Sequence, residues 1–161
     1  MKIISIDPGY DRIGIAILEK DPLKKPSESV VFSTCIITDK KQSFYERMQY
    51  IQGELIKILD QYQPEQLAIE ELYFAKNTKT ALRVAEAKGI IVGTVLEKNI
   101  PVTELHPNHI KIAITGYGAA KKEDILFMLP KLIPIDPVGK LDDELDAIAV
   151  GIAYFAHTRF L

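Results

Sequence analysis

The sequence has few of the features that are typical of secreted or membrane-spanning proteins. It contains one cysteine, Cys35, and no tryptophan, so no disulfide can form within the chain, and Cys35 in its apolar run is expected to be a buried small hydrophobe. Its apolar runs are far shorter than the roughly 20 residues of a membrane-spanning helix. The first residues show no apolar block before a small-residue cleavage site. We therefore expect a cytoplasmic protein.

An excess of positive charge is also missing. The 161 residues include 20 Lys and Arg against 22 Asp and Glu, a net charge of −2, which argues weakly against general affinity for nucleic acid. Total charge does not give its distribution, however. A chain of this length buries enough surface to fold without disulfide bonds, and we expect one domain over residues 1–161.

The hydrophobic pattern predicts an α/β domain with a mixed sheet flanked by helices. A strand pair is expected within 3–18, and Asp7 should stand at a strand end because Pro8 and Gly9 favour a turn. Ser43 and Glu46 make a capping box. Further strands are expected at 30–38, 66–71 and 101–105, and helices at 43–62, 78–98, 107–116, 123–129 and 141–160.

Small residues recur at four-residue steps in the helix at 78–98. Such a ridge lets another helix approach closely, within the chain or between two subunits. Its members are Ala81, Ala85, Gly89 and Gly93.

Acidic residues follow strand or helix signals in three separate segments. Asp7 ends the first strand, and Glu70 and Glu71 end another, where they point to opposite faces so that only one can look toward Asp7. The third cluster comprises Asp142, Asp143, Glu144 and Asp146. If the fold brings them together, oxygen ligands from several elements suit two Mg²⁺ or Mn²⁺ ions.

Plainer interpretations compete with that one. Asp7 could simply cap a turn, and acidic residues suit the first turn of a helix because of its dipole. The dipole accounts for Asp142 and Glu144, but Asp146 borders the apolar face and is aimed at the sheet. Other metal chemistry is disfavoured, because three histidines lack zinc-type spacing and Cys35 lies mid-strand. The histidines are His106, His109 and His157.

Cations and aromatic residues follow the second acidic cluster. Aromatic rings between cations suit unstacked bases flanked by phosphates, although core aromatics beside a solvated helix face give the same composition. The candidates for binding nucleic acid are Tyr73, Phe74, Lys76, Asn77, Lys79, Arg83, Lys111, Lys121 and Lys122.

Four segments resemble the successive motifs of the RuvC family of bacterial Holliday-junction resolvases, in the same order and at similar spacing. They are IDPGYDRIGIAI, AIEELYFAKNTKTALRVAEAKG, HPNHIKIAITGYGAAKK and DDELDAIAVG. The resemblance implies a ribonuclease H-like fold, a homodimer, and Mg²⁺-dependent cleavage of two opposed strands at a four-way DNA junction. It also suggests the RuvA and RuvB branch-migration proteins as partners.

The resemblance also implies roles for individual residues. The catalytic carboxylates would be Asp7, Glu70, Asp143 and Asp146. Lys111 and Lys122 would lie beside the scissile phosphate. Tyr73 would stack at the junction centre, where the family more often has Phe; the tyrosine ring keeps the stacking face.

One of these assignments conflicts with helical spacing. Asp142 is four residues from Asp146 and Asp143 is three, so spacing slightly favours Asp142 as its metal partner. A residue at a helix start can be a cap outside the regular helix. On that argument, and on the resemblance, we side with Asp143.

The expected reaction is hydrolysis with two metal ions, giving a 5′ phosphate and a 3′ hydroxyl. This function has three rivals. A ribonuclease H-like nuclease could act on RNA or on another branched DNA. A kinase of the actin and sugar-kinase group would need a second lobe and a Gly-rich phosphate loop. A non-catalytic junction-binding module fits poorly, because unpaired acids beside phosphate would weaken binding without metal.

Overall fold

The computed structural model describes residues 1–72 and 78–158, excepting the side chains of residues 78 and 79. Its centre is a sheet of five strands in the order β3-β2-β1-β4-β5. β1, β2 and β3 form an antiparallel meander, whereas β4 and β5 run parallel to β1. The strands are β1 (Lys2–Asp7), β2 (Arg12–Lys20), β3 (Glu28–Ile37), β4 (Gln66–Glu70) and β5 (Val102–Leu105). The mixed sheet predicted from the sequence is confirmed.

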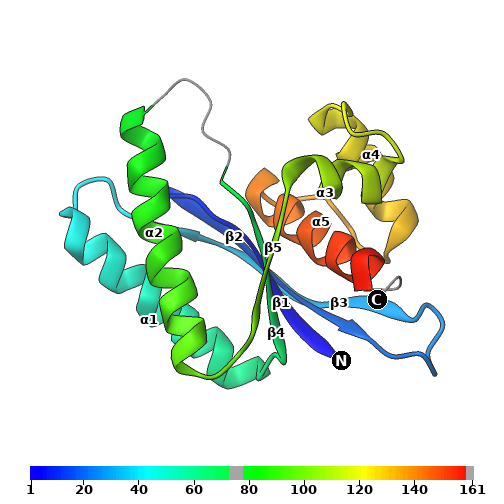
Figure 1. Cartoon of the computed structure of the whole chain (residues 1–161), viewed down its shortest axis with the longest axis horizontal. Helices are drawn as coiled ribbons and strands as arrows, with labels where there is room; N and C mark the ends of the chain where they lie inside the picture. The colour runs from blue at the N-terminus through cyan, green and yellow to red at the C-terminus, as the bar shows by residue number, and fades with distance from the viewer. Residues whose placement is uncertain (73–77, 159–161) are drawn as a thin grey trace.

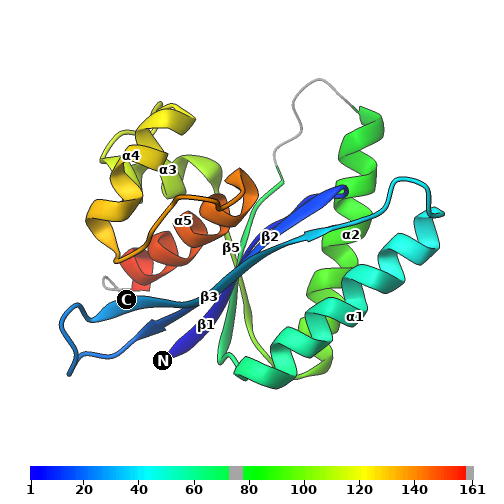
Figure 2. The same ribbon diagram turned by 180° about the vertical axis from the view of Figure 1, so that it is seen from behind.

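Helices cover both faces of this sheet, as Figures 1 and 2 show from opposite sides. α1 and α2 lie on one face, and α5 lies on the other with α3 and α4 outside it. The helices are α1 (Phe44–Tyr62), α2 (Thr78–Glu97), α3 (Pro107–Thr115), α4 (Lys122–Leu132) and α5 (Asp142–His157). Among the described residues no helix is long and apolar enough to cross a membrane.

Alternation along β1 divides the core into two halves. Ile4 and Ile6 pack toward α1 and α2, while Ile3 packs toward α5. Ser5, on the same side as Ile3, donates a hydrogen bond to the carbonyl of Ala147 at 2.7 Å. Because successive side chains of a strand point to opposite faces, Asp7 faces the α5 side.

Helix boundaries follow the predicted signals, with two corrections. The Ser43–Glu46 capping box is present. The fourth helix, expected over residues 123–129, continues as α4 to Leu132 with Pro130 inside it. A proline this close to the helix end removes one backbone hydrogen bond, and the buried Leu129 keeps the last turn on the core.

The second correction concerns the start of α5. Leu141 is the N-cap and Asp142 is already helical, so the expectation that Asp142 caps the helix is wrong. Leu141 makes no side-chain cap hydrogen bond. Instead, the backbone of Glu144 donates to the carbonyl of Leu141 at 3.0 Å. The helix that carries Asp143 and Asp146 therefore begins without a side-chain cap.

Candidate active site

The site is built on the ends of two neighbouring parallel strands. Asp7 is the last residue of β1 and pairs with Gly14 of β2. Ile6 pairs with Ile69 of β4, so Glu70, one residue further, lies next to Asp7 on the same face. Glu71 follows with its side chain exposed to solvent. Of the two glutamates, Glu70 is the one that looks toward Asp7.

The carboxyl groups of Asp7 and Glu70 share a hydrogen bond. Burial, and then the charges of Glu70, Asp146 and Asp143, raise the pKa of Asp7 from 3.8 to about 8. Burial and the charge of Asp146 raise the pKa of Glu70 as well. Three carboxylates thus act on Asp7, and at neutral pH the Asp7–Glu70 pair favours holding a proton.

The other two carboxylates come from the first turn of α5, which rests directly on β2. A β-carbon on Gly14 would stand 1.8 Å from the carbonyl oxygen of Asp143. Only a glycine admits that approach. The contact brings the backbone of Asp143 against the strand that pairs with Asp7, and Asp146 follows one turn later.

Two cations balance the carboxylates of α5. Lys122, at the start of α4, donates to Asp146 at 2.9 Å and lies 3.4 Å from Asp142. Burial lowers the pKa of Lys122, but the bonds to Asp146 and Asp142 outweigh it and raise that pKa. Burial raises the pKa of Asp146 despite the bond from Lys122. On the other side, Arg12 of β2 places Nε 3.1 Å from Oδ2 of Asp143.

Electrostatics separate the two adjacent aspartates. The side chain of Asp142 is 62% exposed and that of Asp143 is 20% exposed. Asp143, not Asp142, is among the charges that raise the pKa of Asp7. The position of Asp143 therefore supports its selection, while its role as a metal ligand stays a prediction.

These residues fit a hard divalent cation in chemistry and charge. All four candidates supply carboxylate oxygens, which Mg²⁺ prefers. Oδ2 of Asp143 is buried and has no hydrogen-bond partner among the described residues, so its lone pairs remain available. Within that part of the chain no three acidic, His or Cys side chains form a finished ligand cage. Ligation therefore requires the pairs with Arg12 and Lys122, and the proton shared by Asp7 and Glu70, to be displaced.

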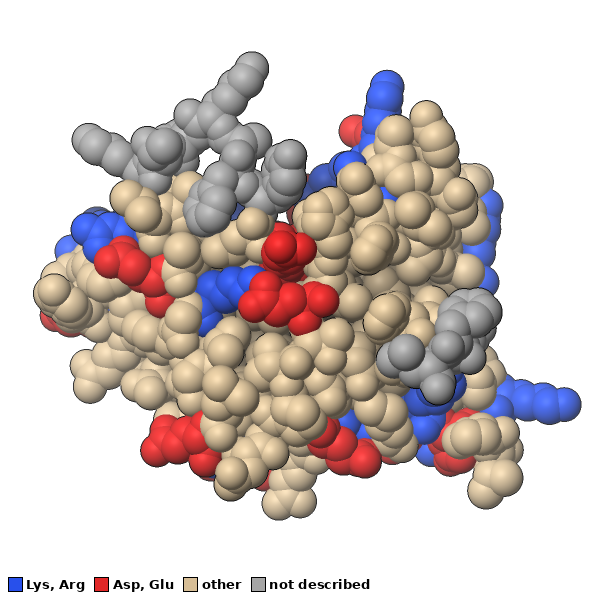
Figure 3. All heavy atoms as spheres, in the orientation of Figure 1, with Lys and Arg blue, Asp and Glu red and all other residues tan. Residues whose placement is uncertain are grey.

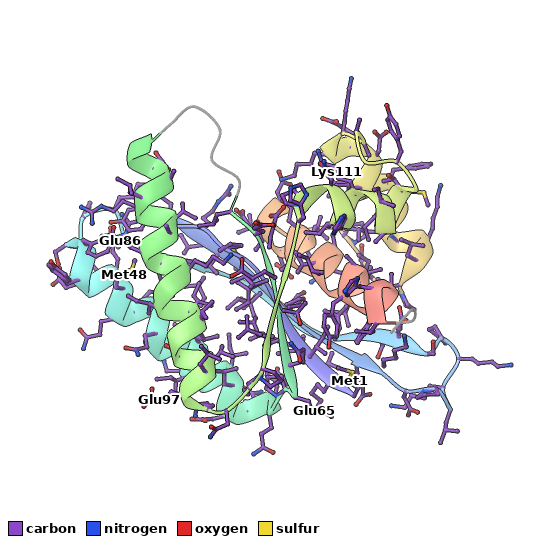
Figure 4. The ribbon with its side chains drawn as sticks, viewed as in Figure 1. Met1, Met48, Glu65, Glu86, Glu97 and Lys111 are labelled. Atoms are coloured by element: carbon purple, nitrogen blue, oxygen red, sulfur yellow. The ribbon has the colours of Figure 1, made fainter. Side chains whose placement is uncertain are left out.

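The basic candidates divide between two sides of the sheet. Lys111, Lys121 and Lys122 line a pocket of about 580 Å³ between α3, α4 and α5, together with Glu70 and Asp146. Arg83 lies on α2, stacked on the ring of Phe44. Figure 4 shows the separation through Lys111 on α3 and Glu86 on α2. Figure 3 shows acidic side chains beside basic ones between the two groups of helices.

Five of the predicted nucleic-acid contacts fall between residues 73 and 79. Tyr73, Phe74, Lys76 and Asn77, and the side chain of Lys79, lie outside the described residues. Cys35 is half-buried rather than buried. Burial, and then the charge of Asp143, raise the pKa of its thiol to about 11, so it carries little nucleophilic thiolate.

Sequence reasoning missed two basic residues beside the carboxylates. Arg12 has the same strand parity as Gly14, so an alternation count along β2 would have placed it on the face of Asp7. Lys88 of α2 is buried, and its Nζ donates to the carbonyl of Glu70 at 3.1 Å and to Glu104 at 2.7 Å. Its contact depends on α2 packing across β4 and β5, for which the sequence offered no signal.

Comparison with known proteins identifies one family. The family profile described as "Crossover junction endodeoxyribonuclease RuvC" matches residues 3–154. A protein of that name from Thermosipho melanesiensis is 41% identical over 99% of this chain and 100% of its own length. Another from Fusobacterium nucleatum is 39% identical over 96% of this chain and 80% of its own length.

A solved structure shares the fold over nearly the whole chain. It is described as T. thermophilus RuvC in complex with Holliday junction substrate, and it superposes with a TM-score of 0.89 and 25% identity. The superposition covers 99% of this chain and 96% of that one. The likeness therefore includes the sheet and both layers of helices.

Proposed function

Because the chain belongs to the RuvC family of crossover junction endodeoxyribonucleases, we propose that the carboxylates gathered on β1, β4 and α5 are its catalytic centre. The protein has a ribonuclease H-like fold and is a structure-specific endonuclease that resolves Holliday junctions. The observation that carries the residue assignment is that three carboxylates from β4 and α5 lie close enough to Asp7 of β1 to raise its pKa. Asp7, Glu70, Asp143 and Asp146 are these residues.

The proposed cofactor is Mg²⁺, two ions in each active site, with Mn²⁺ able to replace it. Divalent metal use follows from the family; the identity and number of ions belong to the proposal. When bound, such ions activate a water molecule for attack on phosphorus and stabilise charge on the leaving 3′ oxygen. The four carboxylates would hold them, and the expected products carry a 5′ phosphate and a 3′ hydroxyl.

Lys122 is the residue proposed to act on the phosphate itself. Its side chain is 45% exposed and already bonded to Asp146, so a shift of a flexible lysine brings Nζ toward a nearby phosphoryl oxygen. A cation there neutralises charge that develops in the transition state. Lys111 lines the same pocket and is proposed to steady the phosphate beside it.

The remaining candidates are proposed to bind the arms of the junction. Lys121 lines the pocket of Lys122, and Arg83 lies on α2, on the other face of the sheet. Tyr73 is proposed to stack on a base at the junction centre, as the family resemblance implies. The other proposed contacts are Phe74, Lys76, Asn77 and Lys79.

A homodimer is proposed because a junction presents two equivalent strands. Twofold symmetry would bring one active site to each. The exposed face of α2 supports this: a β-carbon on Gly89 or Gly93 would meet nothing within 4 Å, so another backbone can approach. Cooperation with RuvA and RuvB, and a cytoplasmic location, complete the proposal.

The decisive experiment compares substrates side by side. Purified protein is incubated with a mobile four-way junction, a flap and an RNA/DNA hybrid, with and without Mg²⁺, and the cut strands are mapped. We expect paired symmetric nicks in the junction that require the metal and disappear in Asp7→Asn. Preference for the flap or the hybrid would favour the alternative, a nuclease for another branched DNA or for RNA.

A further inference from the structure

Arg12 lies beside the candidate metal site and lines a groove that Asp143 also lines. It is the first residue of β2 and shares a face with Gly14, Ala16 and Leu18, of which the last two are buried in the α5 half of the core. Its side chain is 49% exposed. Nothing in the sequence pattern or the family assignment gives this arginine a role.

The contact between Arg12 and Asp143 is close but poorly aligned. Nε lies 3.1 Å from Oδ2, yet that oxygen has no hydrogen bond from any described residue. The attraction is therefore mostly electrostatic. Because Arg12 is half-exposed, water screens the pair, which changes an equilibrium by about two- to fivefold, so a competing charge can displace it.

The groove beside Arg12 provides such a competitor with a place to bind. It has a volume of about 1170 Å³ and lies between the β1–β2 turn, the end of β3 and the start of α2. Three basic side chains among the described residues line it. Lys40 pairs with Asp11 at 2.9 Å and Arg83 pairs with Glu86 at 3.0 Å, whereas Arg12 pairs with a residue of the proposed metal site.

We propose that Arg12 is an exchangeable counter-ion, which pairs with Asp143 in the metal-free protein and moves to a DNA phosphate in this groove when a divalent cation takes Asp143. The inference rests on the proposed function, because it assumes that Asp143 is a metal ligand. Its consequence is cooperativity: metal binding frees a cation for DNA, and by reciprocity DNA binding favours the metal.

The proposal predicts that Arg12→Gln changes metal affinity without DNA but not with a junction bound. Without DNA, metal must displace Arg12, so Arg12→Gln should bind Mn²⁺ about two- to fivefold more tightly than the unaltered protein. With a junction present, that advantage should vanish. Correspondingly, the gain in junction affinity that Ca²⁺ produces should be smaller in Arg12→Gln by the same factor.

Metal affinity is measured by calorimetric titration of Mn²⁺ into the full chain. Junction affinity is measured by fluorescence anisotropy with and without Ca²⁺. Gels confirm that the DNA stays uncut during the anisotropy measurement. Lys40→Gln is the matched control, because it removes one positive charge from the same groove without touching the metal site. It should leave the Mn²⁺ affinity within about twofold. Arg12→Lys keeps the charge and should behave like the unaltered protein, and melting curves confirm that each variant is folded.

Two results would overturn the proposal: an unchanged Mn²⁺ affinity in Arg12→Gln, or an equal change in Lys40→Gln, which would reduce the effect to net charge. Asp143→Asn separates this failure from that of the proposed function. If Asp143→Asn weakens Mn²⁺ binding while Arg12→Gln does nothing, only the inference about Arg12 fails. If Asp143→Asn has no effect on Mn²⁺ binding, the proposed ligand set fails too.

Discussion

Asp7 and Glu70 share a hydrogen bond between their carboxyl groups at the ends of two adjacent parallel strands. Two carboxyls can bond in this way only when one of them holds a proton. The pair therefore stores a proton at a pH where isolated carboxylic acids have lost theirs. Both the stability and the activity of the protein should depend on that proton.

The first prediction concerns stability against pH without metal. The pKa of Asp7 rises from 3.8 to about 8 in the folded protein, so between these values the folded state binds a proton that the unfolded state lacks. Stability should therefore fall as pH rises from about 4 to 8. In EDTA at pH 8.5, Asp7→Asn should melt at a higher temperature, by the equivalent of a few kcal/mol. Melting curves at half-unit pH steps test this, and equal slopes for both proteins would contradict it.

The second prediction concerns the activity of the same variant. Asp7→Asn should lose junction cleavage because the amide is a poor metal ligand, and it should bind junctions equally or more tightly because a negative charge beside phosphate is gone. Cleavage gels and anisotropy titrations measure the two effects. A variant that cuts at a comparable rate would show that Asp7 holds no essential metal.

The third prediction compares Asp143 with Asp142. Asp143→Asn should lose nearly all Mg²⁺-dependent cutting, since its carboxylate is close enough to raise the pKa of Asp7. Asp142→Asn should keep most activity and lose at most about 1 kcal/mol of stability, because its exposed carboxylate makes one long ion pair with Lys122. Parallel rates and melting curves decide. An inactive but folded Asp142→Asn beside an active Asp143→Asn would reverse the assignment.

The fourth prediction tests the close contact between α5 and β2 at Gly14. Gly14→Ala should destabilise the protein by at least about 2 kcal/mol, because the new methyl would strike the backbone of Asp143. It should also weaken Mn²⁺ binding by displacing Asp143. Gly53→Ala is the control: its β-carbon would meet nothing within 4 Å in the middle of α1, and it should gain about 0.5–1 kcal/mol. If both variants melt alike, the close approach does not matter.

The fifth prediction addresses the proposed dimer. Ala85→Arg places a long charged side chain on the face of α2 that carries Gly89 and Gly93, so sedimentation should show monomers that bind junctions poorly. Arg83→Gln, on another part of the helix surface, should leave the dimer intact. An unchanged dimer in Ala85→Arg would place the subunit contact elsewhere.

Local signals in the sequence predicted most elements and the strand-end positions of two carboxylates. Asp7 could be placed because a Pro-Gly turn follows it, and the alternation along β4 left a choice between Glu70 and Glu71. The extension of α4 beyond Pro130 was missed, since a proline near a helix end costs little when the adjacent Leu129 is buried.

Contacts between side chains of different elements could not be predicted from the sequence. The pairs Arg12–Asp143 and Lys88–Glu104 depend on which helix covers which face and on the register between strands. No single segment encodes these relationships. The N-cap was wrongly assigned to Asp142 for a related reason: the N-cap, Leu141, has no capping side chain that would mark it.

The backbone of Asp143 contacts Gly14 in the strand that pairs with Asp7. This contact links residues from nearly opposite ends of the chain. A nascent polypeptide has its first strands and Glu70 long before it has Asp143 and Asp146. Contacts of such large sequence separation slow folding, because closing a long loop costs entropy before the contact forms. Under the proposed assignment the emerging chain lacks two of its four metal ligands, so a fragment that ends before residue 143 should have no nuclease activity.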